Sequence, residues 1–116
     1  MLIVIPFCEP MRQAAIAGNK TCTTRTKRYG KPGDHFGINA YENSRNLQVI
    51  FKLTSVQAHQ LGYVATNFWK QEGFENIAGF ITLWCKLHPS AHWQPLRQVY
   101  IHFFELVPEL LQPGLF

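Results

Sequence analysis

The sequence predicts a small α+β domain, built as a partly closed antiparallel β-barrel with two or three helices at its rim. Segments rich in β-branched and aromatic residues alternate with segments whose apolar residues have helical spacing. The connections between these segments are short, and the sequence contains no internal repeat. A chain of 116 residues, of which 47% are hydrophobic, is long enough for one core and too short for two. We therefore expect one domain over residues 1–116.

The beginning of the chain predicts a strand, a helix and a second extended segment. Residues 2–5 form a short apolar run that favours a strand. Residues 9–17 predict a helix that ends at Gly18, because glycine readily adopts the positive φ found at helix C-termini. Residues 21–25 include three threonines, which favour extended backbone. The composition of residues 30–34 predicts a turn.

The middle of the chain predicts a β-hairpin followed by a helix. Residues 35–42 and 47–61 have the composition of strands, and residues 43–46 form a loop of moderate length between them. The apolar spacing then becomes helical over residues 63–71, until Gly73 interrupts it.

The end of the chain predicts a second helix and a closing strand. Residues 76–87 form a helix that Pro89 ends. The apolar side chains expected to face the core from this helix are Ile77, Phe80, Ile81, Leu83, Trp84 and Leu87. Residues 99–107 are β-branched and aromatic, so we expect a strand that returns to the sheet. Residues 108–116 form a proline-rich tail beyond the core of the domain.

The composition argues against a membrane, secreted or metal-binding protein. No apolar run approaches the length of a membrane span, and the first one is too short for a signal peptide. Cys8, Cys22 and Cys85 are an odd number without metal-ligand spacing, which is typical of reduced thiols in the cytoplasm. His88 and His92 have helical ligand spacing, but a proline lies between them and no third ligand is evident. We expect a cytoplasmic protein that uses no membrane, metal or cofactor.

Positive charge is concentrated in one segment of the chain. The formal net charge is +4, and five basic residues lie within twelve positions that contain no acid. These residues are Lys20, Arg25, Lys27, Arg28 and Lys31. Such a surface attracts phosphates and other anions. The alternative is a solvated loop that confers solubility, and charge does not separate a nucleic-acid binder from an enzyme for nucleosides.

The same segment contains a candidate nucleophile and a candidate base. In extended backbone Thr21, Thr23 and Arg25 share one face, while Lys20 and Thr24 point to the other. Lys20 lies at the end of the segment, where its long amine can fold back toward Thr23. A hydroxyl beside an amine is the pair that nucleophilic catalysis requires. Alternatively, the threonines fill an edge strand and the basic residues are solvated.

Four short motifs follow one another in a characteristic order. They are Gly18-x-Lys20-x-x-Thr23-x-Arg25, Lys31-Pro32-Gly33-Asp34, Gln71-Glu72-Gly73-Phe74 before a helix, and the closing strand segment Val99-Tyr100-Ile101-His102-Phe103-Phe104-Glu105-Leu106. Together they resemble an ASCH domain of the PUA-like superfamily, over about residues 7–106. The resemblance implies a PUA-like barrel with a cleft lined by the first motif and by the acidic residue before the long helix.

The resemblance also implies two classes of activity. Members of this superfamily are associated with RNA binding, and some small members are amidohydrolases that remove the acetyl group from N4-acetylcytidine. The working residues of that branch match Lys20, Thr23 and Glu72. Many ASCH proteins carry a glutamate at the position of Thr23, so the threonine favours the amidohydrolase. We expect Thr21, Arg25 and Phe74 to contact the substrate.

A mechanism consistent with these residues begins with attack of Thr23 on the acetyl carbonyl. Neutral Lys20 takes the hydroxyl proton, and water then releases acetate from the acyl-enzyme. Glu72 orients the lysine, binds the cytosine amino edge or carries a proton to the leaving nitrogen. Alternatively, Glu72 is an ordinary surface carboxylate near a helix start, and Arg25 pairs with Asp34 across the turn.

Two rival functions remain open at the level of sequence. One is a non-catalytic RNA-binding module, and the other is a ribonuclease that uses Lys20 and Arg25 on single-stranded RNA. The basic residues 27–30 and the tail are compatible with a polynucleotide or protein partner. Several aromatic side chains have the chemistry to stack a base, although aromatics at helical spacing are more often core: Phe68, Trp69, Phe74 and Trp84. The sequence does not indicate an oligomeric state.

Overall fold

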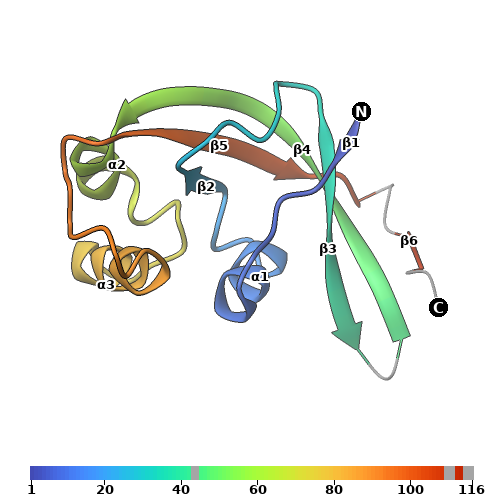
Figure 1. Ribbon diagram of the computed structural model, residues 1–116. Helices are drawn as coiled ribbons and strands as arrows, with labels where there is room; N and C mark the ends of the chain where they lie inside the picture. Colours follow the sequence, from blue (N-terminus) through green and yellow to red (C-terminus); the bar gives the residue numbers. More distant parts are fainter. Residues whose placement is uncertain (43–44, 109–111, 114–116) are drawn as a thin grey trace.

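One curved β-sheet and three helices make up the fold (Figure 1). The computed structural model describes residues 1–42, 45–108 and 112–113. The elements in chain order are β1 (Leu2–Ile3), α1 (Glu9–Ile16), β2 (Cys22–Arg25), β3 (His35–Glu42), β4 (Arg45–Gln60), α2 (Leu61–Phe68), α3 (Ile77–Leu87), β5 (Gln98–Leu106) and β6 (Gln112–Pro113). The predicted α+β composition is therefore confirmed.

Strand β4 is the central strand of the sheet. The strand order is β1-β3-β4-β5-β2, and β6 pairs with β4 outside this path. The first half of β4 pairs with β3 and its second half with β5, with a register shift between Leu53 and Ser55. A bulge of this kind bends a strand and increases its twist. The long strand thereby carries β3 at one end of the molecule and β5 at the other (Figure 1).

The prediction of a partly closed antiparallel barrel needs correction on two points. The sheet is mixed, because β1 runs parallel to β3. It is also open: among the described strands, β1 and β2 end the path and no pairing joins them. Both end strands are short, with two and four residues, so neither offers enough edge for closure.

The predicted bounds of α1 and α3 are confirmed to within a residue. Gly18 adopts φ 84° directly after α1. Asn76 begins α3, where its side chain accepts a hydrogen bond from the amide of Gly79 at 2.8 Å. Such caps satisfy amide groups that have no partner within the helix.

Helix α2 begins earlier and ends earlier than residues 63–71. The amide of Leu61 donates to the carbonyl of Arg97, and the amide of Gly62 donates to the carbonyl of Pro95. These two bonds place the first turn of the helix against the segment before β5, so β4 ends at Gln60 rather than at 61. Turns follow over residues 69–73, and Gly73 has φ 97°.

Three other predicted segments differ in extent. The first strand covers residues 2–3 instead of 2–5. In the predicted loop over residues 43–46, Arg45 and Asn46 belong to β4, whereas 43–44 lie outside the described residues. Within the predicted tail, Gln112 and Pro113 form β6 and pair with β4, whereas 109–111 and 114–116 lie outside the described residues.

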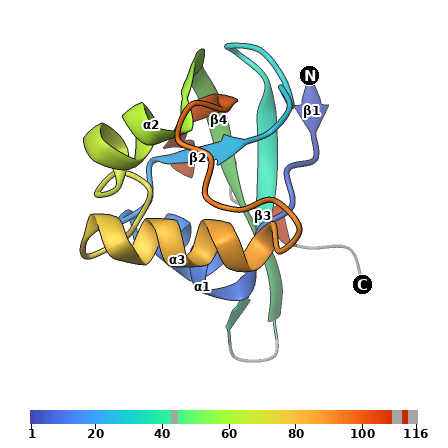
Figure 2. The ribbon, with the colours of Figure 1, turned by 60° about the vertical axis from the view of Figure 1, so that its left-hand side comes forward.

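Two hydrophobic clusters form the core. The first joins α2 and α3 to β2 and β5, and it contains Cys22, Leu61, Val64, Ala65, Phe80, Trp84, Val99 and Ile101. The second joins α1 to β3, β4 and β5, and it contains Ile5, Ala15, Phe36, Ile38, Phe51, Leu53 and Phe104. In Figures 1 and 2, α2 and α3 lie together at one end of the sheet, opposite the β3–β4 hairpin.

The apolar face of α3 is only partly in the core. Phe80 and Trp84 are buried, as predicted, whereas Ile77 and Leu87 are exposed. Leu87 lies at the end of α3 that borders the cavity described below.

Among the described residues, no helix combines the length and apolar character needed to cross a membrane. The thiols of Cys8, Cys22 and Cys85 are free.

Candidate active site

Lys20 is positioned by the end of α1. The positive φ of Gly18 turns the chain back, and the amides of Asn19 and Lys20 both donate to the carbonyl of Ala14, at 2.9 and 3.1 Å. The chain then enters β2, which is held against β5 from Cys22 to Arg25. The side chain of Lys20 is 2% exposed, so a charged group is held beneath the surface.

Glu72 reaches the same place from the turn between α2 and α3. The carbonyl of Gln71 accepts hydrogen bonds from the amides of Thr21 and Cys22, which ties this turn to the start of β2. Gly73 then passes so close to Lys20 that a Cβ at position 73 would lie 3.1 Å from the Cβ of the lysine. Glu72 is 3% exposed. The alternative of an ordinary surface carboxylate is therefore wrong.

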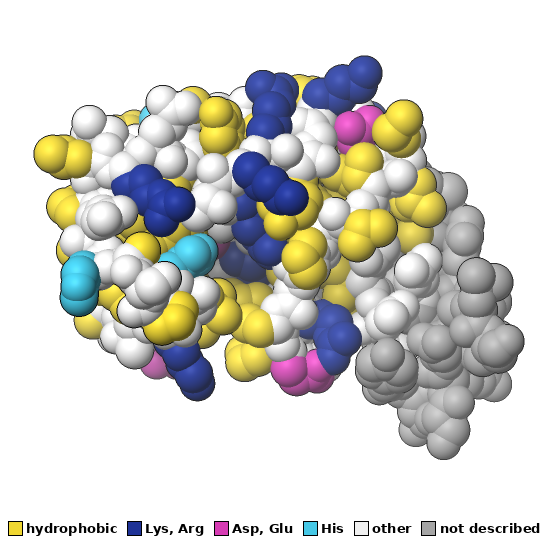
Figure 3. Space-filling model, viewed as in Figure 1, with side chains coloured by type: hydrophobic (Ala, Val, Ile, Leu, Met, Phe, Trp, Pro, Cys, Tyr) yellow, Lys and Arg dark blue, Asp and Glu magenta, His cyan; other side chains and the backbone are white. Residues whose placement is uncertain are grey.

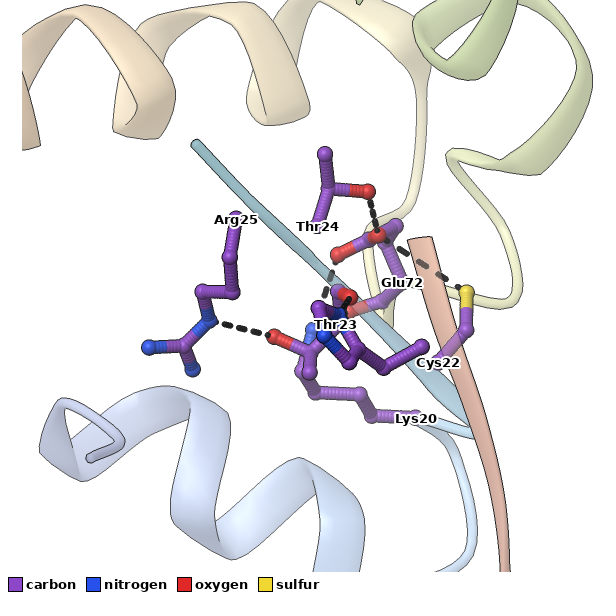
Figure 4. A network of polar contacts seen from close by, with 7 residues as sticks. Lys20, Cys22, Thr23, Thr24, Arg25 and Glu72 are labelled. Atoms are coloured by element: carbon purple, nitrogen blue, oxygen red, sulfur yellow. Dashed lines mark hydrogen bonds and ion pairs between the residues drawn. The ribbon is translucent and has the colours of Figure 1, made fainter. Parts of the chain in front are cut away.

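Lys20 and Glu72 form a buried ion pair (Figure 4). The Nζ of Lys20 donates to Oε1 of Glu72 at 2.9 Å and to its backbone carbonyl at 3.0 Å. A buried charge is costly unless it is paired and hydrogen-bonded. This pair is a strong candidate for a functional group because burial is expensive for both partners.

Thr24 and Cys22 hold the other carboxylate oxygen of Glu72. The hydroxyl of Thr24 donates to Oε2 at 2.6 Å, and the thiol of Cys22 lies 3.7 Å from the same atom. Burial, followed by the negative charge of Glu72, raises the pKa of Cys22, so it stays a thiol. The side chains of positions 20, 22 and 24 thus converge on one carboxylate, as the alternation of an extended chain requires.

Thr23 and Arg25 belong to the other set of alternating positions. The Nε of Arg25 donates to Oγ1 of Thr23 at 3.1 Å (Figure 4). The guanidinium lies 4.9 Å from the ring centre of Phe7 and 5.7 Å from that of Tyr29, within the range of cation–π attraction. Burial lowers the pKa of Arg25 from its ordinary value.

Asp34 is not the partner of Arg25. Its carboxylate accepts a hydrogen bond from the amide of Lys31 at 3.1 Å. That bond lowers the pKa of Asp34, which keeps the carboxylate ionised within its own turn. Among the described residues, no carboxylate forms an ion pair with Arg25. The guanidinium is therefore available to the cavity.

A cavity of about 420 Å³ opens over this cluster. Lys20, Thr23, Thr24 and Glu72 line its polar floor, and Arg25 lines it beside them. A nucleoside-sized ligand is compatible with a pocket of this volume. Figure 3 shows Lys and Arg side chains gathered around the middle of the face that it displays.

The walls of the cavity are apolar and aromatic. The lining residues from the α3 side are Phe74, Phe80, Leu83, Trp84, Leu87 and His88. Those from the start of α1 and the loop after β2 include Phe7, Cys8, Met11 and Tyr29. Phe80 and Trp84 stack at 6.2 Å, and Trp84 and His88 at 4.2 Å, so the α3 wall presents a row of rings. Flat apolar walls over a charged floor suit a planar polar ligand.

His102 connects the backbone of Thr23, on the floor of the cavity, to that of Tyr29 in its wall. It is fully buried in β5, where its Nδ1 bonds to the carbonyl of Thr23 and its Nε2 accepts from the amide of Tyr29. Since a carbonyl only accepts, Nδ1 carries the proton and the ring is neutral. Burial lowers the pKa of His102, and the charges of Arg25 and Arg28 add to the effect.

The structure brings together five of the six residues proposed from the sequence. Lys20, Thr23, Arg25, Glu72 and Phe74 all line the cavity. Thr21 does not line it: its side chain is exposed, and its backbone amide and carbonyl pair with Gln71 and Phe104. The predicted contact from Lys20 to Thr23 is also not formed as a hydrogen bond between the described side chains, because the amine is held by Glu72.

Two features of the site were missed by sequence reasoning. Thr24 was placed correctly on the face of Lys20, but its bond to Glu72 depends on a partner 48 positions away. His102 is one of five histidines in the sequence and lies in the predicted closing strand without a motif of its own. The strand alternation was the available signal for Thr24, and nothing in the spacing of His102 marked its role.

The aromatic residues divide between core and cavity. Phe68 and Trp69 pack against the first hydrophobic cluster and do not line the cavity. Trp84 does both, since it is buried in that cluster and borders the cavity.

Within residues 1–42, 45–108 and 112–113, no three His, Cys, Asp or Glu side chains are grouped so that they could hold a metal ion.

Comparison with known proteins identifies the architecture. No protein-family model matches the chain, and no curated protein sequence matches it. A protein of the DUF984 family from Enterococcus faecalis V583 superimposes with a TM-score of 0.62 at 21% identity, over 84% of this chain and 67% of that one. An ASCH domain from Lactobacillus crispatus JV V101 superimposes with a TM-score of 0.61 at 14% identity, over 86% of this chain and 76% of that one. These likenesses show the fold.

Proposed function

We propose that this chain, which has the fold of an ASCH domain, is an amidohydrolase that converts N4-acetylcytidine to cytidine and acetate. The observation that carries the proposal is the buried ion pair of Lys20 and Glu72 on the floor of the cavity, with the hydroxyl of Thr23 on the same floor. These three residues match the working set of the amidohydrolase branch that the sequence resembles. The aromatic wall of α3 supports a planar base as the ligand.

The first half of the reaction acylates Thr23. Its Oγ bonds to the acetyl carbon, and its proton passes to neutral Lys20. The bond from carbon to N4 then breaks, N4 gains a proton that the neutral carboxyl of Glu72 supplies, and cytidine leaves. In this step Lys20 must approach the Thr23 hydroxyl more closely than in the free protein, as catalytic hydrogen bonds often tighten only once substrate is bound.

The second half of the reaction releases the acyl group. Lys20 first passes its proton to Glu72, and a water molecule then gives a proton to neutral Lys20 and bonds to the ester carbon. The ester bond breaks, acetic acid leaves and ionises to acetate in water, and the Thr23 oxygen takes the proton back from Lys20. The nucleophile and the base thus return to their starting states.

Glu72 makes neutral Lys20 available at this site. The ion pair and the neutral pair contain the same number of protons, with the proton on Lys20 in one and on Glu72 in the other. Passing the proton across the 2.9 Å contact creates the base without removing a charge from the site to water. Glu72 is therefore both the orienting group and the proton store of Lys20.

Arg25 stabilises the charge that develops on the acetyl oxygen. Its Nε already donates to Oγ1 of Thr23, so the guanidinium lies beside the atom that attacks. A fixed cationic donor next to a developing oxyanion lowers the barrier most when the site excludes water. No described carboxylate forms an ion pair with Arg25, so its guanidinium can contact the developing oxyanion.

The direct test is incubation of the purified chain with N4-acetylcytidine, followed by chromatography for cytidine. We expect cytidine and acetate to appear in equal amounts. A matched sample of the Lys20→Met variant should produce neither above the uncatalysed rate. Absence of cytidine with the unmodified chain would contradict the proposed function.

RNA binding is the second candidate, and the surface beside the cavity favours it. Lys27 and Arg28 are exposed, and the Nζ of Lys27 lies 5.0 Å from the ring centre of Tyr29, which lines the cavity. Basic side chains next to an aromatic ring are typical of single-strand binding. Titration with a single-stranded RNA at several salt concentrations tests it, because each phosphate contact adds about 0.7 to the salt slope. Cleavage of that RNA during the titration would instead indicate the ribonuclease.

A further inference from the structure

We infer that Thr24 is the residue that delivers the proton to the leaving nitrogen. This role rests on the proposed amidohydrolase function and adds a fourth working residue to it. Thr24 lines the cavity, is 7% exposed, and donates to Oε2 of Glu72 at 2.6 Å. It therefore touches both the proton store of the site and the space that the substrate occupies.

The direction of the Thr24 hydrogen bond determines what the hydroxyl offers to the cavity. An ionised carboxylate only accepts, so in the ion-paired state the hydroxyl proton of Thr24 points at Oε2. The lone pairs of Oγ1 are left to accept from the N–H of a bound acylated amine. A hydroxyl that donates a short bond to an anion is also a better acceptor. Thr24 thus holds the leaving nitrogen before the reaction.

Proton transfer from Lys20 to Glu72 reverses this hydrogen bond. The neutral carboxyl turns about its Cγ–Cδ bond and donates to Oγ1 of Thr24, and the hydroxyl proton of Thr24 then turns toward the nitrogen. As the carbon–nitrogen bond breaks, Thr24 gives its proton to N4 and receives the proton of Glu72. Lys20 has meanwhile taken the proton of Thr23, so the ion pair of Lys20 and Glu72 is restored.

The position of β2 allows both threonines to act on one substrate. Thr23 and Thr24 point to opposite faces of the strand, yet both line the cavity. This is possible because β2 is the last strand of the sheet and, among the described strands, pairs only with β5. We expect adjacent positions on this edge to bring the nucleophile and the proton donor to the two sides of the scissile bond.

Lys20 is less suited than Thr24 to protonate the leaving nitrogen directly. Two of the protons on its Nζ are committed to the side chain and the backbone carbonyl of Glu72. A separate donor on the far oxygen of Glu72 does not require Lys20 to give up either of these bonds.

The test compares an amide with an activated ester on the full chain. N4-acetylcytidine requires protonation of its leaving nitrogen, whereas p-nitrophenyl acetate releases a stable phenolate without a proton. We expect Thr24→Val to lower kcat on N4-acetylcytidine by about 100-fold or more, the usual contribution of a general acid, and to leave turnover of the ester nearly unchanged. Thr24→Ser keeps the hydroxyl and should retain most activity on both substrates.

Two controls define the result. Thr23→Ala removes the nucleophile and should abolish turnover of both substrates. Cys22→Ala removes the other contact to Oε2 of Glu72 from a side chain that does not line the cavity, so any loss should be equal for amide and ester. Melting of each variant shows whether it is folded.

The outcomes separate the two claims. An equal loss on amide and ester in folded Thr24→Val, or no loss on the amide, would overturn the role of Thr24 and leave the amidohydrolase in place. Failure of the unmodified chain to hydrolyse N4-acetylcytidine would overturn both.

Discussion

At the scale of single residues, position along β2 decides which partner each side chain meets. Lys20 and Thr24 turn to Glu72, whereas Thr23 meets Arg25. This alternation is predictable because the threonine content favours extended backbone and successive side chains then point to opposite faces. The contact to Glu72 spans about half the chain, so local spacing did not predict it. Only the order of the motifs placed Glu72 in the same cleft.

The nucleophile is tested by two neighbouring threonines. Thr23→Ala should abolish deacetylation in a chain that still folds, at a cost of about 1–3 kcal/mol because Arg25 loses its hydrogen-bond acceptor. Thr21→Ala is the matched control, since Thr21 is exposed and outside the cavity. Rates by chromatography and melting by circular dichroism give the answer. Equal losses of activity in both variants would show that the segment is structural.

The buried ion pair should dominate the stability of the site. Lys20→Met or Glu72→Gln leaves one charge buried without its partner, which should lower the free energy of unfolding by about 3–5 kcal/mol. The double variant removes both charges, so it should be more stable than either single variant. Urea unfolding measures all three. Additive losses in the double variant would mean that the two side chains are not coupled.

Lys20→Arg separates the role of Lys20 as a base from the effect of its positive charge. Guanidinium keeps the positive charge beside Glu72 but stays protonated, so it is unable to act as a base. We expect no deacetylation from a folded variant. Turnover close to that of the unmodified chain would leave Lys20 with an electrostatic role only.

At the scale of elements, two glycines with positive φ differ in how closely other residues approach them. Gly18 (φ 84°) ends α1 with open space around the position of a Cβ, whereas Gly73 (φ 97°) faces Lys20 and Ala14. Alanine at either position should cost about 1–2 kcal/mol of backbone strain. Only Gly73→Ala should also lower activity, because its Cβ would lie 3.1 Å from that of Lys20. Equal activity in the two variants would contradict the tight approach.

His102 connects β5 to β2 and to the loop that carries Tyr29, and its charge state should set the acid stability. Burial lowers its pKa below the ordinary value of 6.5, so the unfolded chain binds more protons than the folded one as the pH falls. The free energy of unfolding should decrease from about pH 6.5 downward until the pH has passed the folded pKa. His102→Gln should remove that part of the dependence in urea unfolding. If the free energy of unfolding of His102→Gln depends on pH as that of the unmodified chain does, His102 is not the group responsible.

At the scale of the whole molecule, the class of fold and most elements could be predicted, but not the openness of the sheet. Strands and helices follow from local apolar spacing and composition. Closure depends on how far β4 bends at the shift between Leu53 and Ser55 and on edge strands of two and four residues. The start of α2 likewise depends on bonds to residues 95 and 97. These are long-range contacts, which local patterns do not record.

The basic surface should be separable from the cavity. Of Lys27, Arg28 and Lys31, none lines the cavity, so replacing all three with Gln should leave nucleoside turnover nearly unchanged. Any affinity for single-stranded RNA should fall, with the salt slope reduced by about 0.7 for each lost phosphate contact. Filter binding and chromatography on the same preparation measure both properties. Loss of nucleoside turnover in this variant would place the basic loop in the active site.

The most direct test of the proposed mechanism is mass spectrometry of the protein quenched in acid during turnover of N4-acetylcytidine. The mechanism predicts a transient acetyl ester on the peptide that contains Thr23, and no such adduct in Thr23→Ala. Steady production of cytidine with no acetylated protein, at a rate that Thr23→Ala does not change, would contradict it.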